Sequence, residues 1–154
     1  MTARRHLESD FAADDESPGF LLWQITNRWQ AAQRAALKPL GLTHVQFVLL
    51  ASLTWLRSDG PVHQRDLATH ASTDPMMTSQ VLRTLEARGL VVRTPDPRDR
   101  RARTLSVTEG GRTLAKHAIM VVEGCDRAFF APLEDVGAFV HALQELKAHA
   151  TQPA

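Results

Sequence analysis

Residues 99–108 read DRRARTLSVT, a charged run that changes into a strand-like sequence and ends on a threonine suited to cap a helix. The preceding stretch Leu90-Val91-Val92-Arg93 has the pattern of a strand, and residues 104–107 have the pattern of its antiparallel return. The loop between them is expected over 95–103 and is rich in arginine. The stretch therefore predicts a β-hairpin with a basic tip.

Helical patterns lie on both sides of this hairpin. We expect helices over about 18–40, 43–57, 63–70, 75–88, 109–131 and 134–150. Thr43 and Gln46 form a capping box, and Asp74 is a good N-cap because Pro75 follows it. Two short helices joined by a tight polar turn predict a helix-turn-helix. The expected fold is mainly α with a small β-hairpin wing.

Length and composition indicate a single globular domain. The chain has 154 residues, of which 44% are hydrophobic and 23% charged. Its longest apolar run, residues 47–53, is far shorter than the roughly 18 residues that a membrane span needs. The first sixteen residues are acidic and carry no secretory signal. We therefore expect a soluble cytoplasmic protein with no membrane partner.

No catalytic or metal site is expected. The seven histidines include no pair three or four residues apart, so the spacing of a helical metal site is missing. Neither a phosphate-binding glycine loop nor a nucleophile elbow occurs. The single cysteine, Cys125, lies on the apolar stripe of the 109–131 helix, which predicts a buried and inert thiol. The sequence predicts neither enzyme activity nor a cofactor.

Charge is segregated along the chain, although the net charge is only +1. Residues 1–16 hold five acidic side chains against two arginines, whereas residues 83–112 hold eight arginines against four carboxylates. A general use of arginine for the surface explains any single one of these side chains. Their clustering favours a binding partner with negative charge, such as nucleic acid.

The sequence resembles the MarR family of bacterial winged helix-turn-helix regulators. The residues that carry the resemblance are Asp99-Arg100-Arg101-Ala102, followed by Leu105-Ser106-Val107-Thr108 and Gly111. The segment Leu85-Glu86-Ala87-Arg88-Gly89-Leu90-Val91 adds to it, and the resemblance extends over about residues 18–146. It implies a homodimer whose first and last helices interlock, with one winged unit per subunit on a pseudo-palindromic DNA operator.

This resemblance gives the expected domain organisation. Residues 1–16 are expected to be a flexible acidic leader, and 17–154 a single MarR-like domain. Within that domain, 17–42 and 109–150 are the expected dimerisation helices, and 43–108 the DNA-binding winged helix-turn-helix.

The fourth helix is the expected reader of the major groove. If Val81, Leu82 and Leu85 face inward, the opposite face presents Met76, Ser79, Gln80, Arg83 and Thr84, with Met77 near its border. Gln80 suits adenine, Arg83 suits guanine or a phosphate, and an exposed methionine suits a thymine methyl group. The alternatives are a core edge for the two methionines and a merely solvated face for Gln80 and Arg83.

In the hairpin, the two-residue period of a strand puts Asp99 and Arg101 on one face and Arg98 and Arg100 on the other. The family resemblance assigns Arg101 to the DNA minor groove, where narrow grooves concentrate negative potential. It assigns Asp99 as the carboxylate that orients Arg101. Arg98, Arg100 and Arg103 are then expected to contact phosphates.

A ligand site is a further implication of the resemblance, since small aromatic acids or phenols often bind between the dimerisation helices and the winged unit in this family. The candidate residues are Trp23, Gln24, Asn27 and His44, where polar groups lie beside an aromatic side chain. The alternative for Trp23, Trp29 and Trp55 is a place in the core or the dimer interface. The family's peroxide sensors carry a cysteine near the start of the first helix, and this sequence has none there.

Together these features predict a DNA-binding transcriptional regulator that acts as a ligand-responsive homodimeric repressor. The rival hypothesis is a protein-interaction module that keeps the winged-helix fold without binding DNA.

Overall fold

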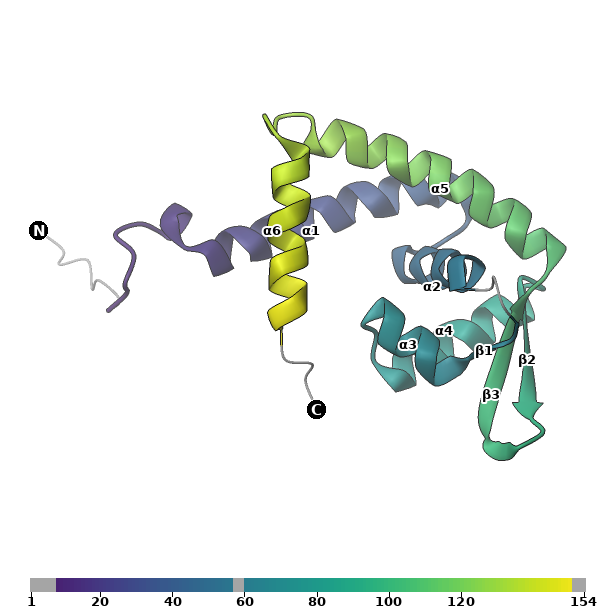
Figure 1. The fold of residues 1–154 in the computed structure, drawn as a ribbon. Coiled ribbons are helices and arrows are strands. Elements are labelled where there is room, and N and C mark those ends of the chain that lie inside the picture. Colours follow the sequence, from purple (N-terminus) through teal and green to yellow (C-terminus); the bar gives the residue numbers. More distant parts are fainter. Residues whose placement is uncertain (1–7, 57–59, 151–154) are drawn as a thin grey trace, which may run out of the picture.

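The computed structural model describes residues 8–56 and 60–150 of the chain and shows a helical protein with one small sheet (Figure 1). The α-helices are α1 (Pro18–Leu37), α2 (His44–Leu56), α3 (Gln64–Ala71), α4 (Pro75–Ala87), α5 (Glu109–Phe130) and α6 (Val136–His149). The strands are β1 (Val62–His63), β2 (Val91–Asp96) and β3 (Asp99–Val107), and two 3-10 turns are η1 (Asp14–Glu16) and η2 (Lys38–Leu40). The predicted fold class, mainly α with a β-hairpin wing, is confirmed.

Local cap chemistry starts the helices where the sequence predicts. At α2, Thr43 Oγ1 accepts from the Gln46 amide at 3.2 Å while Gln46 Oε1 accepts from the Thr43 amide at 3.1 Å. Asp74 accepts from the amide of Met77 at α4, and Thr108 accepts from the amide of Gly111 at α5. The capping box and both N-caps are therefore present in the structure.

The sheet is larger than the predicted hairpin. Its strands are antiparallel in the order β1-β3-β2, and β1 adds a short third strand that the sequence did not indicate. The predicted loop over 95–103 is wrong, because pairing continues outward to Asp96 opposite Asp99. A register shift between Pro95 and Asp96 accommodates this extension. The wing is thus a long, paired ribbon with a very short tip.

The core of the chain lies between α2, α3, α4 and the sheet. Leu50 and Leu53 of α2, Leu67 of α3 and Leu82 of α4 are fully buried, and Leu105 of β3 is 1% exposed. Figure 1 shows these elements gathered into one unit, while the first half of α1 projects away from it. Trp55, for which the core or the dimer interface was the alternative, is 83% exposed and so is not part of the core of this chain.

The outer helices form a second region with a different surface. α5 packs along α1, and α6 turns back from the end of α5 (Figure 1). α6 has no buried residue, although Val136, Val140, Leu143 and Leu146 form an apolar stripe along it. This stripe needs a partner that the single chain does not supply.

The acidic leader is partly described. Its residues 1–7 lie outside the described residues, as do the C-terminal residues 151–154. Order was expected to begin at Ser17, but Asp14–Glu16 already forms the 3-10 turn η1. Glu16 stabilises this turn by accepting from the amide of Ala12 at 3.1 Å.

Hydropathy of the helices gives no single membrane span. Among the described residues, no individual helix is long and apolar enough to cross a bilayer, and the one helix pair that qualifies together, Pro18–Leu40 with His44–Leu56, is bent by 77°.

Candidate nucleic-acid interface

The turn between α3 and α4 is fixed by local polar contacts. Ser72 adopts the left-handed conformation at φ 53°, which ends α3 and turns the chain. Thr78 is fully buried, and its hydroxyl lies 2.7 Å from the hydroxyl of Thr73 and donates to the carbonyl of Asp74 at 2.8 Å. These contacts hold the two helices of the predicted helix-turn-helix in one arrangement.

The outward face of α4 carries most of the side chains predicted to read DNA. Gln80, Arg83 and Thr84 are exposed, and Met76 and Met77 are 78% and 40% exposed. The core-edge alternative is therefore wrong for Met76, whereas Met77 lies at the border of this face. Ser79 is half-buried, so it presents less of its side chain than its neighbours do.

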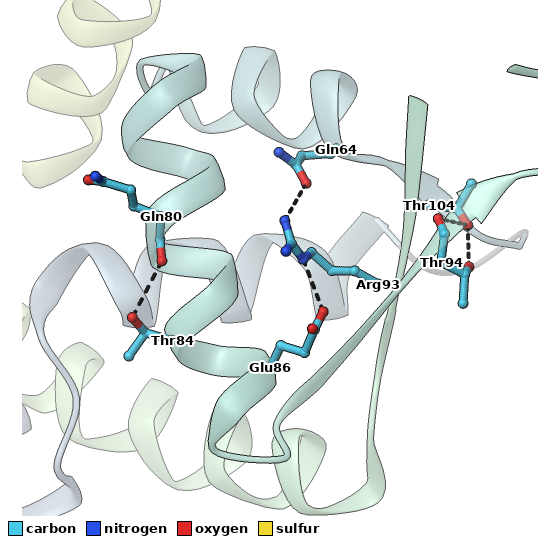
Figure 2. Close-up of polar contacts among 7 residues, drawn as sticks. All are labelled: Gln64, Gln80, Thr84, Glu86, Arg93, Thr94 and Thr104. Atoms are coloured by element: carbon cyan, nitrogen blue, oxygen red, sulfur yellow. Dashed lines mark hydrogen bonds and ion pairs between the residues drawn. The ribbon is translucent and has the colours of Figure 1, made fainter. Parts of the chain in front are cut away.

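Thr84 and Gln80, both on this face, differ in whether the side chain is hydrogen-bonded within the chain. The Thr84 hydroxyl donates to the carbonyl of Gln80 at 3.4 Å, so it is turned onto its own helix (Figure 2). The Gln80 amide points away from the sheet in the same view and has no side-chain hydrogen bond within the described part of the chain. Gln80 is therefore free to bind another molecule.

A half-buried arginine joins the wing to both helices of the helix-turn-helix. Arg93 of β2 donates through Nε to Glu86 Oε2 at 3.0 Å and through Nη1 to Gln64 Oε1 at 3.4 Å (Figure 2). Its side chain is only 15% exposed. Because Glu86 belongs to α4 and Gln64 to α3, Arg93 fixes the wing relative to α4. We refer to Arg93, Glu86 and Gln64 as the Arg93 clamp.

The wing tip is shaped by two aspartates that accept from backbone amides. Asp96 Oδ1 accepts from the amide of Arg98, and Asp99 Oδ1 accepts from the amide of Arg101, both at 2.9 Å. The contact that the structure gives Asp99 is thus with the backbone of Arg101 and not with its guanidinium. Asp99 closes the turn that presents Arg101, which is a different way of placing that side chain from the one predicted.

The arginines of 83–112 divide into two groups. Arg88, Arg93, Arg103 and Arg112 donate to oxygen atoms of this chain. Arg83, Arg98, Arg100 and Arg101 are exposed and have no side-chain partner among the residues that the structure describes. The second group leaves four unpaired positive charges on α4 and the wing tip, where a polyanion can neutralise them. Arg103 was predicted with this group but donates to the carbonyl of Arg100 at 3.4 Å.

A second polar cluster lies between α1, α2 and α5. Asp126 Oδ1 accepts from Trp29 Nε1 at 2.8 Å and from Gln33 Nε2 at 2.6 Å. The ring of His44 meets Trp29 edge-on, with centroids 5.0 Å apart. Gln33 is fully buried, and its Oε1 has no hydrogen-bond partner in the described structure. Trp29, Gln33, His44 and Asp126 are called the Trp29 cluster below.

The predicted ligand residues are only partly brought together by this arrangement. His44 belongs to the Trp29 cluster, but Trp23 is 67% exposed and Asn27 donates to the carbonyl of Trp23 within α1. Gln24 is half-buried. The tryptophan in contact with His44 is Trp29, which lies six residues further along the helix. A polar Gln33 four residues after Trp29, on the apolar side of α1, was a signal for this cluster that the sequence reading missed.

Two titratable groups near this cluster have shifted pKa values. Burial lowers the pKa of His44, the charge of Arg34 lowers it further, and Asp126 opposes both. Burial raises the pKa of the Cys125 thiol, and the neighbouring Asp126 carboxylate adds to the rise. Cys125 is half-buried, so the prediction of a buried thiol is wrong in degree.

A surface hollow is lined by neither the predicted DNA-contacting residues nor the Trp29 cluster. It has a volume of about 460 Å³ between the end of α2, β1 and α3, and His63 and His70 contribute to its lining. None of the predicted ligand residues lines it. Within residues 8–56 and 60–150, no three histidine, cysteine or acidic side chains are grouped so as to hold a metal ion.

Comparison with known proteins gives a consistent result. Residues 42–102 match the model of the MarR family. An uncharacterized HTH-type transcriptional regulator of Bacillus subtilis, YdcH, is 44% identical over 142 residues, which cover 92% of this chain and 97% of that protein.

Solved structures of two relatives have the same fold. CouR of Rhodococcus jostii RHA1, bound to p-coumaroyl-CoA, aligns with a TM-score of 0.77 and 32% identity over 94% of this chain and all of that one. The MarR-family protein Rv2887 of Mycobacterium tuberculosis, in complex with DNA, aligns with a TM-score of 0.65 and 32% identity over 87% of this chain and 98% of that one. Rv2887 is also known in complex with p-aminosalicylic acid, and that structure aligns with a TM-score of 0.65 and 34% identity, covering 85% of this chain and 98% of that one.

Proposed function

Since the chain belongs to the MarR family of DNA-binding transcriptional regulators, we propose that it acts as a homodimeric repressor that reads a pseudo-palindromic operator with α4 and the wing. The observation that carries this proposal is the set of four unpaired arginines, Arg83, Arg98, Arg100 and Arg101, on two elements joined by the Arg93 clamp. A rigid pair of elements with free positive charge suits two adjacent grooves of duplex DNA.

Each element has its own proposed role. On α4, Gln80 and Arg83 contact base edges in the major groove, while Met76 and Met77 pack on thymine methyl groups. At the wing tip, Arg101 enters the minor groove, where its charge is favoured by the narrow-groove potential. Arg98 and Arg100 contact phosphates. Ser79, Thr84 and Arg103 act at the margin of this face, because each is half-buried or already bonded within the chain.

The exposed apolar stripes support a homodimer. α6 carries its stripe wholly on the surface, and the first half of α1 exposes Phe20, Leu22 and Ile25 at 40%, 56% and 40%. A two-fold dimer that covers these faces places two α4 helices about one turn of DNA apart, roughly 10 base pairs. In this proposal 17–42 and 109–150 form the dimerisation region and 43–108 the DNA-binding unit.

The Trp29 cluster is the proposed effector site. It lies where α1, α2 and α5 meet, so a ligand there touches both the dimerisation helices and the DNA-binding unit. The free Gln33 Oε1 accepts from a phenol or acid proton, and the Trp29 and His44 rings pack against an aromatic ring. Support comes from the aromatic acid bound to Rv2887 and the coumaroyl thioester bound to CouR. Trp23 and Asn27 act at most at its margin.

The experiment selects binding sites from genomic duplexes and measures their affinity by fluorescence anisotropy at two salt concentrations. Arg83→Ala and Arg101→Ala should each weaken binding about 5- to 100-fold and reduce the salt dependence, because each removes one base or phosphate contact. Arg127→Ala, an exposed arginine on α5, is the matched control and should bind like the wild type.

The same assay tests the effector site and the rival function. Benzoates and phenols that release DNA from the wild type should release it poorly from His44→Ala. A protein-interaction module without DNA binding would show no salt-dependent affinity for any selected duplex, and that result would reject the proposal.

A further inference from the structure

Two adjacent methionines place thioether sulfurs on the face of α4 that is proposed to read DNA. Met76 is 78% exposed and Met77 40% exposed. Their backbone is held in place because the amide of Met77 donates to Asp74 at 2.9 Å, at the first turn of the helix. Both side chains therefore reach solvent from a fixed point, beside Gln80 on the next turn.

The single cysteine lies on a different helix and is less exposed than these two thioethers. Cys125 is half-buried on α5, and burial together with Asp126 raises the pKa of its thiol. Because peroxides react with the thiolate, a raised pKa lowers the reactivity of this sulfur. Oxidation of methionine does not depend on ionisation, and its rate follows exposure of the sulfur.

We propose that Met76 and Met77 form an oxidation-sensitive modification site, at which conversion to methionine sulfoxide by a hydroperoxide releases the protein from DNA. The inference rests on the proposed role of α4 in reading DNA. A lone pair of the thioether sulfur attacks the terminal peroxide oxygen, so the O–O bond breaks and an S–O bond forms. Sulfur loses two electrons to the peroxide, and with hydrogen peroxide the departing hydroxide takes the proton of the transferred hydroxyl and leaves as water.

The chemical change opposes binding at this position. A sulfoxide replaces a flexible apolar sulfur with a polar group that accepts hydrogen bonds. In the major groove it loses the apolar contact with a thymine methyl and places a polar oxygen where an apolar group fits. Bound DNA covers the same two side chains, so the free protein is the form that is oxidised. Oxidation thus removes free repressor from the binding equilibrium.

The test treats the wild-type dimer with hydrogen peroxide and follows two quantities together. Peptide mass spectrometry measures sulfoxide at each methionine, and anisotropy measures affinity for a selected duplex. We expect affinity to fall about tenfold, the usual cost of one mismatched contact, in step with sulfoxide at Met76 and Met77. Bound duplex should slow oxidation of these two residues, and methionine sulfoxide reductase should restore the affinity of the oxidised wild type.

Matched variants assign the effect to its residues. Met76→Leu with Met77→Leu keeps apolar side chains without thioethers and should resist peroxide. Met120→Leu, which removes the 70% exposed methionine of α5, and Cys125→Ser should remain sensitive. An affinity loss that persists in the double leucine variant overturns the proposal, and so does full oxidation of both methionines in the wild type with unchanged affinity. The reductase reversal needs no variant and shows that methionine oxidation causes the loss. Mass spectrometry of the same samples then assigns it to Met76 and Met77 even if the leucine protein folds poorly.

The arginine variants separate this proposal from the one on which it rests. If Arg83→Ala weakens binding but peroxide does not, only the oxidation site is rejected. If Arg83→Ala, Arg101→Ala and peroxide all leave affinity unchanged, the DNA-reading face itself is wrong.

Discussion

The DNA-binding unit and the dimerisation region have helices with the same apolar periodicity, but only in the DNA-binding unit does the same chain bury the apolar stripe. In α4, Leu82 and Leu85 are fully buried against other elements of the same chain. In α6, Leu143 and Leu146 are 42% and 64% exposed although their spacing is equally regular. An apolar stripe therefore identifies a face that must be covered, and only the structure tells whether the same chain covers it.

The largest expected effect comes from charging the α6 stripe. Leu143→Glu with Leu146→Glu should give a folded monomer, because neither side chain supports the core of the chain. Losing one of two linked DNA-binding units should weaken operator binding by about 10²- to 10⁴-fold. Sedimentation gives the mass, circular dichroism the fold and anisotropy the affinity.

The matched control for this prediction places the same charges on the other side of α6. His141→Glu with Ala148→Glu should remain dimeric and bind DNA, since these residues lie opposite the stripe. A dimer that survives glutamates at Leu143 and Leu146 would show that α6 is not part of the interface.

A smaller effect is expected within the DNA-binding unit, at the Arg93 clamp. Arg93→Met keeps the apolar stem but removes the bonds to Glu86 and Gln64, so the wing is no longer fixed relative to α4. Because the Glu86 end is partly exposed, the clamp contributes about 1 kcal/mol, which corresponds to roughly fivefold weaker operator binding. Hydrogen exchange should show faster opening of β2 and β3 with the dimer intact.

Thr94→Val is the comparison for the clamp. It removes the 2.8 Å contact between the Thr94 and Thr104 hydroxyls, which lies within the wing and does not reach α4 (Figure 2). In Thr94→Val we expect faster hydrogen exchange of β2 and β3 without a loss of operator affinity. If Thr94→Val and Arg93→Met lost operator affinity equally, the stiffness of the wing, and not its position relative to α4, would control binding.

The smallest expected effect is a pH dependence at the boundary between the two regions. The pKa of His44 is lowered in the folded chain from its ordinary value of 6.5, so the unfolded chain takes up the proton first as the pH falls. Stability should therefore decrease on acidification below pH 6.5, and the decrease should end below the folded-state pKa. Thermal melts between pH 8 and 5.5 should show this decrease for the wild type relative to His44→Gln. If the wild type instead became more stable than His44→Gln as the pH falls, the lowered pKa of His44 would be contradicted.

Local chemistry made much of the fold predictable from the sequence. Thr43 with Gln46, Asp74 with Pro75, and Thr108 each satisfy helix-end amides within three residues, so the sequence alone locates those ends. The apolar spacing of α4 likewise predicted that Gln80 and Arg83 are exposed. The hairpin loop was predicted too long because the bonds from Asp96 and Asp99 to nearby amides favour a tight tip, which hydrophobic alternation does not reveal.

Contacts between distant segments were not predictable in the same way. Trp29 and Asp126 are 97 residues apart, and nothing in either local pattern indicates that they meet. The Arg93 clamp was missed because the sequence places Arg93 only in a strand of a basic segment, and its contacts with Glu86 and Gln64 depend on how the hairpin packs on α3 and α4. The sequence therefore predicted the exposed face of α4 better than the contacts of the site proposed for the effector.

The junction between β3 and α5 has a mechanical consequence. Gly111 lies so close to the carbonyl of Leu90 that any side chain there would clash, and the Thr108 hydroxyl donates to the carbonyl of Gly89 at 2.7 Å. The start of α5 is therefore locked to the chain just after α4, and its 22 residues extend about 33 Å from that point. Because this junction is tight, we expect a rigid-body tilt of α5 near Phe130 to move the end of α4 and the start of the wing with it.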